Sequence, residues 1–228
     1  MPVIAFANPK GGSGKTTAAL LLATELAAKG AAVTVIDADP EQWIVRWAGL
    51  PGKPDNLDVV SIREEDALVD AIEAAASASQ FVIVDLEGTA NMMVTDSIGM
   101  ADLVVIPLQG SAMDAVGGGK VLKLIRNQER TTKRTINYAM LLTRTSAAVT
   151  SRALRDVVEQ LRSSKVPLFA TPIVERAAYR DLFSYGGTVG GLDPASVSNV
   201  DKALQNAQEF AGEVLTRLNI TKPMRKVA

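Results

Sequence analysis

Residues 9–17 read Pro-Lys-Gly-Gly-Ser-Gly-Lys-Thr-Thr, and this stretch limits what the chain can fold into more than any other. The apolar run at 3–7 before it predicts a buried strand, and the run at 18–23 after it predicts a helix. A strand, a glycine turn and a helix N-terminus form a cradle for phosphate, because backbone N–H groups converge on anionic oxygens and the helix adds partial positive charge.

The side chains of the cradle suit a nucleotide. Lys15 can reach the β- and γ-phosphates, and the Thr16 hydroxyl can ligate Mg²⁺. A glycine-rich turn with incidental lysines would not explain the adjacent hydroxyls. The expected nucleotide contacts here are Gly11, Gly12, Ser13, Gly14, Lys15, Thr16 and Thr17.

The loop has Pro9 and Lys10 where the usual G-x-x-x-x-G-K-[ST] pattern begins with glycine. With this second lysine it resembles the deviant Walker A loop of the ParA/MinD family of ATPases. The resemblance covers nearly the whole chain and is closest to the small ParA-type partition proteins that lack an N-terminal helix-turn-helix. In that family the first lysine reaches the partner subunit's nucleotide, so the resemblance implies that role for Lys10.

Two acids follow 22 and 24 residues after Lys15, at Asp37 and Asp39. This spacing returns the chain through one helix to the carboxyl edge of a neighbouring parallel strand, where ligands of open α/β sheets bind. The resemblance implies that Asp39 orients the attacking water and that Asp37 lies near the Mg²⁺ shell. Lys10, Lys15 and Asp39 are then the catalytic residues. The alternative is that both acids cap the next helix.

A third acid, Asp85, ends the apolar run at 81–84, which is the pattern of a strand that delivers one carboxylate to a metal. The expected metal ligands are therefore Thr16, Asp37 and Asp85. The family continues D-x-P-P, whereas this chain places Glu87 in the turn. We expect Glu87 to contact the partner subunit or an adaptor; the alternative is a solvated turn residue.

The base contacts are expected from the second half of the chain. A strand at 136–143 ends at Thr143, near the adenine by resemblance, and the segment that begins at Thr171 and Pro172 resembles the loop over the base. Thr143 and Pro172 are thus the predicted base-side contacts. Trp43 and Trp47, four residues apart, are expected as core or dimer contacts rather than base-stacking groups.

The fold expected is a doubly wound, mostly parallel α/β sheet with helices on both faces. One P-loop ATPase domain would span residues 1–218, followed by a short basic tail at 219–228. Glycines 117–119 should kink or fray a helix. The remaining expected strands are 31–36, 59–62, 103–107 and 166–170, and the expected helices are 16–29, 41–47, 64–78, 147–163 and 198–218.

Composition excludes several functions. The 228 residues contain no cysteine, which excludes the iron–sulfur relative with the same loop, the nitrogenase iron protein. They contain no histidine, which excludes His-based catalysis and most zinc sites. Neither a secretory signal nor an apolar run of the ~18 residues that a membrane span needs is present in the sequence, so a cytoplasmic protein is expected.

Charge is divided unevenly between the halves. Residues 1–119 hold 6 Lys/Arg and 16 Asp/Glu, which gives a formal net charge of −10. Residues 120–228 hold 18 Lys/Arg and 9 Asp/Glu, which gives a formal net charge of +9. This predicts a basic surface that contacts DNA phosphates without reading sequence; the alternative is a merely solvated basic surface. The candidates are Lys120, Lys123, Arg126, Arg152, Arg155, Arg162, Lys202, Arg217, Lys222, Arg225 and Lys226.

The resemblance implies a nucleoid-associated ATPase that uses ATP and Mg²⁺, with weak intrinsic activity. It would form a homodimer around ATP, bind DNA nonspecifically and position a plasmid, chromosome locus or protein cargo, with hydrolysis stimulated by a ParB-like or cargo-adaptor protein.

One alternative is a membrane-cycling ATPase like MinD; the tail argues against it, because it offers little apolar surface. Another is a metabolic enzyme such as a dethiobiotin-synthetase-like ligase, against which Lys10 argues. A Rossmann dehydrogenase has less support than either alternative, since Lys15 and Thr16 would have no role in binding a dinucleotide.

Overall fold

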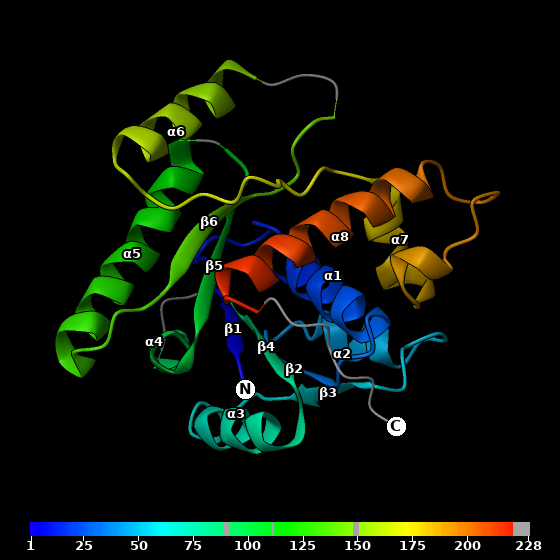
Figure 1. The fold of residues 1–228 in the computed structure, drawn as a ribbon, viewed down its shortest axis with the longest axis horizontal. Coiled ribbons are helices and arrows are strands. Elements are labelled where there is room, and N and C mark those ends of the chain that lie inside the picture. Colours follow the sequence, from blue (N-terminus) through cyan, green and yellow to red (C-terminus); the bar gives the residue numbers. More distant parts are fainter. Residues whose placement is uncertain (89–91, 111, 148–150, 221–228) are drawn as a thin grey trace.

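The computed structural model describes residues 1–88, 92–110, 112–147 and 151–220 (Figure 1). Its centre is a six-stranded sheet in the order β3-β2-β4-β1-β5-β6. All strand pairings are parallel, which confirms the predicted doubly wound fold. The strands are β1 Val3–Phe6, β2 Val33–Ala38, β3 Leu57–Ser61, β4 Phe81–Leu86, β5 Leu103–Leu108 and β6 Tyr138–Leu142.

Helices cover both faces of the sheet, as Figure 1 shows. Alternate strand residues face opposite layers, so that Ile4 and Phe6 pack on one side and Val3 and Ala5 on the other. The first layer contains α1 Lys15–Ala28, α2 Trp43–Ala48, α7 Ala177–Tyr185, the 3₁₀ turn η1 Val189–Gly191 and α8 Val200–Arg217. The second contains α3 Ala67–Ala78, α4 Met92–Met100, α5 Ala112–Thr132 and α6 Arg152–Ser163.

The connections define where a ligand can bind. Strand β1 pairs with β4 on one side and β5 on the other. Helix α1 leads from β1 to β2, beyond β4, whereas α5 leads from β5 to β6 on the opposite side. The chain therefore turns in opposite directions from the centre of the sheet, and such a switch point leaves a crevice outside the carboxyl ends of the strands.

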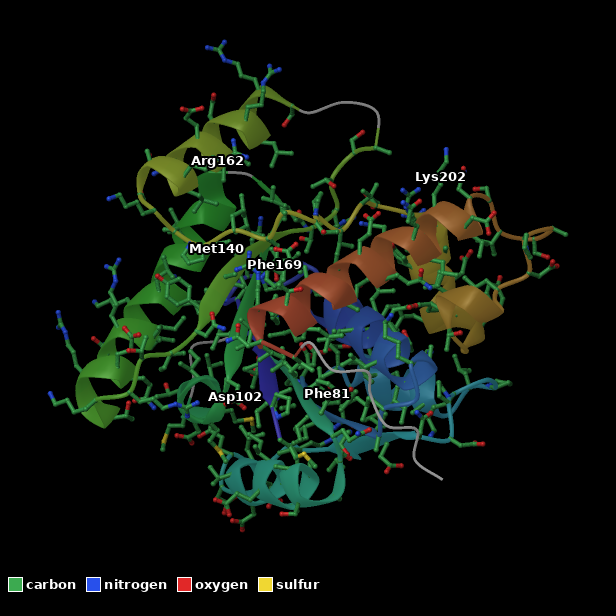
Figure 2. All side chains as sticks on the ribbon, viewed as in Figure 1. Phe81, Asp102, Met140, Arg162, Phe169 and Lys202 are labelled. Atoms are coloured by element: carbon green, nitrogen blue, oxygen red, sulfur yellow. The ribbon has the colours of Figure 1, made fainter. Side chains whose placement is uncertain are left out.

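Helix α5 passes through Gly117, Gly118 and Gly119 as one continuous helix, so the predicted kink or fray is wrong. The first two glycines allow close packing instead. A Cβ on Gly117 would lie 3.0 Å from Asn8 Oδ1, and one on Gly118 would lie 3.0 Å from Met140 Cε. Figure 2 shows Met140 on the strand beside α5.

The predicted strand at 166–170 is also wrong, because Leu168 forms only an isolated bridge with Met140. Helices α4 and α7 were not expected from the sequence. The candidate DNA contacts Lys222, Arg225 and Lys226 lie outside the described residues. Within the part that is described, no helix has the length and hydropathy needed to cross a bilayer.

Candidate nucleotide-binding site

A cavity of about 670 Å³ lies at the carboxyl edge of the sheet. The predicted phosphate loop, residues 11–17, lines one part of it. Residues 173–176 and helix α7 line another, and Asp39 also contributes. The fold thus brings the loop, one predicted catalytic acid and the base-side segment around a single space, although they are far apart in the sequence.

The phosphate loop adopts a conformation that suits an anion. Gly12 and Gly14 have φ angles of 72° and 93°, in the left-handed region that a side chain would strain. Helix α1 then begins at Lys15 without a side-chain cap and without an acidic residue in its first turn. The first N–H groups of a helix lack intrahelical partners, so these groups are available to phosphate oxygens.

Three side chains outside residues 9–17 hold the loop. The Asn8 amide accepts from the Lys10 N–H at 2.9 Å and donates to the Pro107 carbonyl. The Gln109 amide donates to the Gly12 carbonyl. Thr143, predicted as a base contact, donates through its hydroxyl to the Ser13 carbonyl at 2.6 Å and lines the cavity beside the loop. The ends of β5 and β6 therefore support the loop.

Lys15 is almost completely buried at the foot of the cavity, with 5% of its surface exposed. Burial lowers the pKa of its ammonium group, while Asp85, Asp39 and Glu87 oppose that shift. A buried cation surrounded by acids and facing an anion cradle is the arrangement that phosphate binding requires.

Asp85 is fully buried, and neither of its carboxylate oxygens has a hydrogen-bond partner. Burial raises its pKa to about 8; the adjacent Asp37 adds to the shift, whereas Thr16 and Lys15 oppose it. The hydroxyl of Ser13, in the phosphate loop, is likewise buried without a partner. Since buried polar groups are nearly always satisfied, these orphaned oxygens fit a bound Mg²⁺–nucleotide.

Asp37 is the register partner of Asp85 on the neighbouring strand, but its oxygens are already engaged. Its Oδ2 accepts from the N–H groups of Ile44 and Val45, each at 3.0 Å, so it caps helix α2. Burial raises its pKa, and those backbone N–H groups oppose the shift. These contacts match the capping alternative, whereas the Asp85 carboxylate interacts only with side chains, among them Thr16 and Lys15.

Asp39 is placed as expected, on the cavity wall with the phosphate loop. One of its carboxylate oxygens accepts from the Glu41 N–H at 2.9 Å, which holds the side chain in a tight turn ahead of α2. Lys10, in contrast, belongs to the loop but does not line the cavity. Pro172 does not line it either; its carbonyl accepts from Asn206, and the residues after it form the wall.

The far wall of the cavity carries three aromatic rings, Trp43, Tyr179 and Phe183. Trp43 is 44% exposed, stands edge-on to Phe183 at 6.4 Å and carries the Arg46 guanidinium 4.9 Å above its ring. Trp47, one turn later, is fully buried in the core. The two tryptophans, both expected as core or dimer contacts, are therefore divided between core and cavity.

An ion-pair cluster lies on the same wall. Glu175 pairs with Arg144 at 3.1 Å and with Arg180 at 3.3 Å, and all three residues line the cavity. The side chains are about half exposed, so the pairs are weak energetically but place two guanidinium groups beside the cavity.

The predicted DNA contacts that lie within the described residues fall on three helices. Arg217 is not available, because it donates to Glu213 and to the Leu168 carbonyl and lies 4.4 Å above the Phe169 ring. Figure 2 places Arg162 on α6 and Lys202 on α8, at separate positions in the view. The exposed candidates are Lys120, Lys123 and Arg126 on α5, Arg152, Arg155 and Arg162 on α6, and Lys202 on α8.

Sequence reasoning missed several of these residues. Asn8 directly follows the predicted strand at 3–7 and Gln109 lies two residues after the one at 103–107, and a position at the carboxyl edge of a parallel sheet was a usable signal. Tyr179 belongs to the segment from Thr171 that resembles the loop over the base, whereas Phe183 gave no signal by itself, since helix α7 was not predicted and aromatic residues are more often core.

The parallel sheet, the glycine loop before α1 and the buried acid at the end of β4 define a P-loop NTPase of the ParA/MinD type. The chain belongs to the VirC1/ParA family: the family described as VirC1 protein matches residues 1–219. It is 38% identical over 218 residues to Protein ParA of Rhizobium radiobacter, covering 96% of this chain and 98% of that protein.

Two further similarities agree with this assignment. A maintenance of carboxysome distribution protein A from Halothiobacillus neapolitanus is 27% identical over 209 residues, covering 90% of this chain and 94% of that protein. An ATP complex of a variant McdA from Cyanothece shares the fold, with a TM-score of 0.76 at 16% identity and 99% of both chains covered.

Proposed function

We propose that this protein is an ATP-dependent switch: two copies dimerise around Mg-ATP, bind DNA nonspecifically and separate after hydrolysis. One observation carries the proposal. A single cavity is lined by an uncapped helix N-terminus in a glycine loop, by the buried Lys15 and by Asp39, and the fully buried Asp85 carboxylate lies close to Thr16 of the same loop. These are the groups that phosphoryl transfer from ATP to water needs, and it needs little else.

Each residue has a distinct part in that reaction. Lys15 and the N–H groups of the loop bind and orient the phosphates, while Thr16 and Asp85 would hold Mg²⁺, which when bound neutralises charge that develops on the phosphate oxygens. Asp39 positions water at the terminal phosphate. Hydrolysis by this arrangement alone is expected to be weak, because a water held by one carboxylate is poorly activated until a partner completes the site.

The partner subunit would supply the missing cation. Lys10 is in the phosphate loop yet outside the cavity lining, which suits a side chain directed at the nucleotide of the other subunit. Its N–H bond to Asn8 fixes the backbone from which that side chain departs. Glu87, in the turn after β4, is proposed to contact the same partner or an adaptor.

DNA contacts are assigned to the exposed basic residues of α5, α6 and α8. They would bind phosphates without reading sequence, so affinity should fall steeply with salt. A dimer presents two such surfaces and gains affinity by effective concentration. The protein would then be cytoplasmic and nucleoid-associated, and an adaptor, ParB-like or cargo-bound, would stimulate hydrolysis to move a plasmid, chromosome locus or protein assembly.

The test combines light scattering with retention of two unrelated DNA duplexes, each with ATP, ADP and no nucleotide. Wild type should dimerise and retain both duplexes only with ATP. Lys15→Gln should lose both activities, and Asp39→Ala should stay dimeric and DNA-bound. Equal retention with ADP and ATP, or ATP-dependent sedimentation with anionic liposomes in place of DNA, would overturn the proposal.

Lys10 is tested separately. Lys10→Gln should bind ATP with near wild-type affinity yet remain monomeric, since the lost charge acts on the other subunit. The control is Lys29→Gln, which removes an exposed lysine at the far end of α1. A Lys10→Gln protein that dimerises as well as this control would rule out the role in trans.

A further inference from the structure

The base-side wall of the cavity is an irregular segment whose support is divided between two neighbours. On one side, residues 167–175 run along β6 and the loop after it: the Phe169 N–H donates to Met140 O at 2.9 Å and the Ile173 N–H to Leu142 O at 2.8 Å. In an extended chain, backbone groups point alternately to opposite sides. The remaining groups must therefore find partners elsewhere, because buried backbone polar groups are rarely left unpaired.

Side chains of helix α8 provide those partners. Arg217 donates to the Leu168 carbonyl at 2.6 Å, and Glu213 accepts from the N–H groups of residues 170 and 171, each at 2.9 Å. Asn206 bonds the next part of the segment, at residues 172 and 174. The three α8 residues are spaced by seven and four positions, which places them on one face of the helix.

Asn206 differs from the other two because its partners form or adjoin the cavity wall. Its Nδ2 donates to Pro172 O at 2.8 Å, and its Oδ1 accepts from the Val174 N–H at 3.0 Å. The Tyr179 hydroxyl donates to the Ala203 carbonyl at 2.8 Å and shares that single proton with the same Oδ1, 3.2 Å away. Because an N–H can only donate and a carbonyl can only accept, these partners fix the orientation of the amide.

The amide is well protected, since only 8% of Asn206 is exposed. Val174 and Tyr179 line the cavity, whereas Asn206 does not. Removing the amide would leave a partly buried N–H and a partly buried carbonyl without partners, which costs more than the bonds themselves contribute. The wall would relieve that cost by moving, and no bond joins Asn206 to the phosphate loop at the other part of the cavity.

We propose that Asn206 is a positioning residue for nucleotide recognition: from helix α8 it fixes the wall that receives the nucleoside, and it leaves the phosphate subsite unaffected. This inference rests on the proposed function, because it requires that the cavity binds ATP. The cavity then has two parts. The loop at 11–17 forms the phosphate subsite, and Asn206 holds the nucleoside wall in shape without touching the ligand.

The test measures the affinity of Mg-ATP and of Mg-tripolyphosphate, which has the phosphates without the nucleoside. Asn206→Ala should weaken Mg-ATP about tenfold, in line with the removal of one or two partly buried hydrogen bonds, and should leave tripolyphosphate within about twofold of wild type. Tyr179→Phe removes only the hydroxyl, so it should weaken Mg-ATP relative to Mg-tripolyphosphate as Asn206→Ala does, but by a smaller factor. This second variant keeps the test usable if Asn206→Ala fails to fold.

Glu213→Gln is the matched control, because it weakens the same α8-to-segment support at residues that do not line the cavity. It should lower thermal stability without changing the affinity ratio. Asn206 is merely structural if Asn206→Ala lowers stability but keeps the ratio of Mg-ATP to Mg-tripolyphosphate affinity. The same conclusion follows if Glu213→Gln changes that affinity ratio equally. A wild type that binds tripolyphosphate and ATP equally would overturn the inference alone, whereas one that binds neither would overturn the proposed function with it.

Discussion

The hydroxyl of Thr143 donates a 2.6 Å hydrogen bond to the carbonyl oxygen of Ser13, 130 residues earlier in the chain. The same side chain packs against Gly14, whose missing Cβ would lie only 3.1 Å from Thr143 Cβ. The end of β6 therefore holds the phosphate loop through one polar bond and one close contact, and the glycine at position 14 is needed for both its φ angle and this contact.

Replacing Thr143 should affect phosphate binding in proportion to that bond. Thr143→Val keeps the shape of the side chain and removes the hydroxyl. We therefore expect Mg-ATP and Mg-tripolyphosphate to bind about three- to tenfold more weakly, because one hydrogen bond contributes about 1 kcal/mol. Thr143→Ser keeps the hydroxyl and should bind nearly as wild type in isothermal titration calorimetry. A Thr143→Val protein with lower affinity for ATP alone would return Thr143 to the base-contact role predicted from the sequence.

The glycines of α5 offer a matched pair of substitutions. Gly119 is exposed and has open space around it, so Gly119→Ala should stabilise the helix by about 0.5–1 kcal/mol, or roughly 2–4 °C in Tm. Gly117→Ala should lose that gain, because its Cβ would press on Asn8, whose amide is held at both ends. Equal Tm gains in thermal unfolding would show that α5 can move away from the loop.

Glu25 should make stability depend on pH. It is buried in α1, and burial raises its pKa above the usual 4.5, with Lys29 and Gln208 opposing the shift. A raised carboxyl pKa means that the folded state resists ionisation, so the native protein loses stability as pH rises from 4.5 through the folded pKa.

Glu25→Gln removes this penalty. Its Tm should exceed that of wild type at pH 7.5, and the difference should vanish near pH 4. Glu73→Gln, at an exposed site on α3, is the control. A Tm difference for Glu25→Gln that stays constant between pH 4 and 7.5 would contradict the assignment.

Asp85 should connect Mg²⁺ to ATP affinity. Its unpartnered oxygens lie beside Thr16, so Asp85→Asn removes the charge that a divalent cation would meet. Wild-type affinity for ATP should fall at least tenfold when EDTA replaces Mg²⁺, and the variant should bind with the same weak affinity in both buffers. Asp37→Asn should retain most of the Mg²⁺ effect, since its oxygens cap α2; an equal loss in both variants would place Asp37 in the metal shell.

The basic residues can be separated by the salt dependence of DNA binding. Arg155→Ala on α6 should lower the slope of log affinity against log salt by about 0.9 for each DNA phosphate that the protein no longer neutralises. Arg217→Ala should leave the slope unchanged and lower Tm, because that side chain supports residues 168–171 rather than facing solvent. Fluorescence anisotropy across a salt series distinguishes the two outcomes.

Much of the fold and part of the site could be predicted from short stretches. The apolar runs that end at Asp37 and Asp85 are parallel strands buried on both faces, and such strands read as continuous hydrophobic segments. The phosphate loop is contiguous, so its geometry follows from its own glycines and the helix after it. Helix α7 and the irregular path of residues 166–170 were not predictable in this way, because their stability comes from packing against distant elements.

The sequence by itself therefore determined the order of the chemical groups along the chain: a phosphate cradle, then acids at the carboxyl edge of a parallel sheet. Only the tertiary structure decided which distant groups complete the site. It assigned Thr143 to the loop, divided Trp43 from Trp47, engaged Asp37 at a helix end and placed Asn206 behind the far wall. The physical reason is that a hydrogen bond between residues far apart in sequence leaves no local pattern, since each partner alone is an ordinary polar side chain.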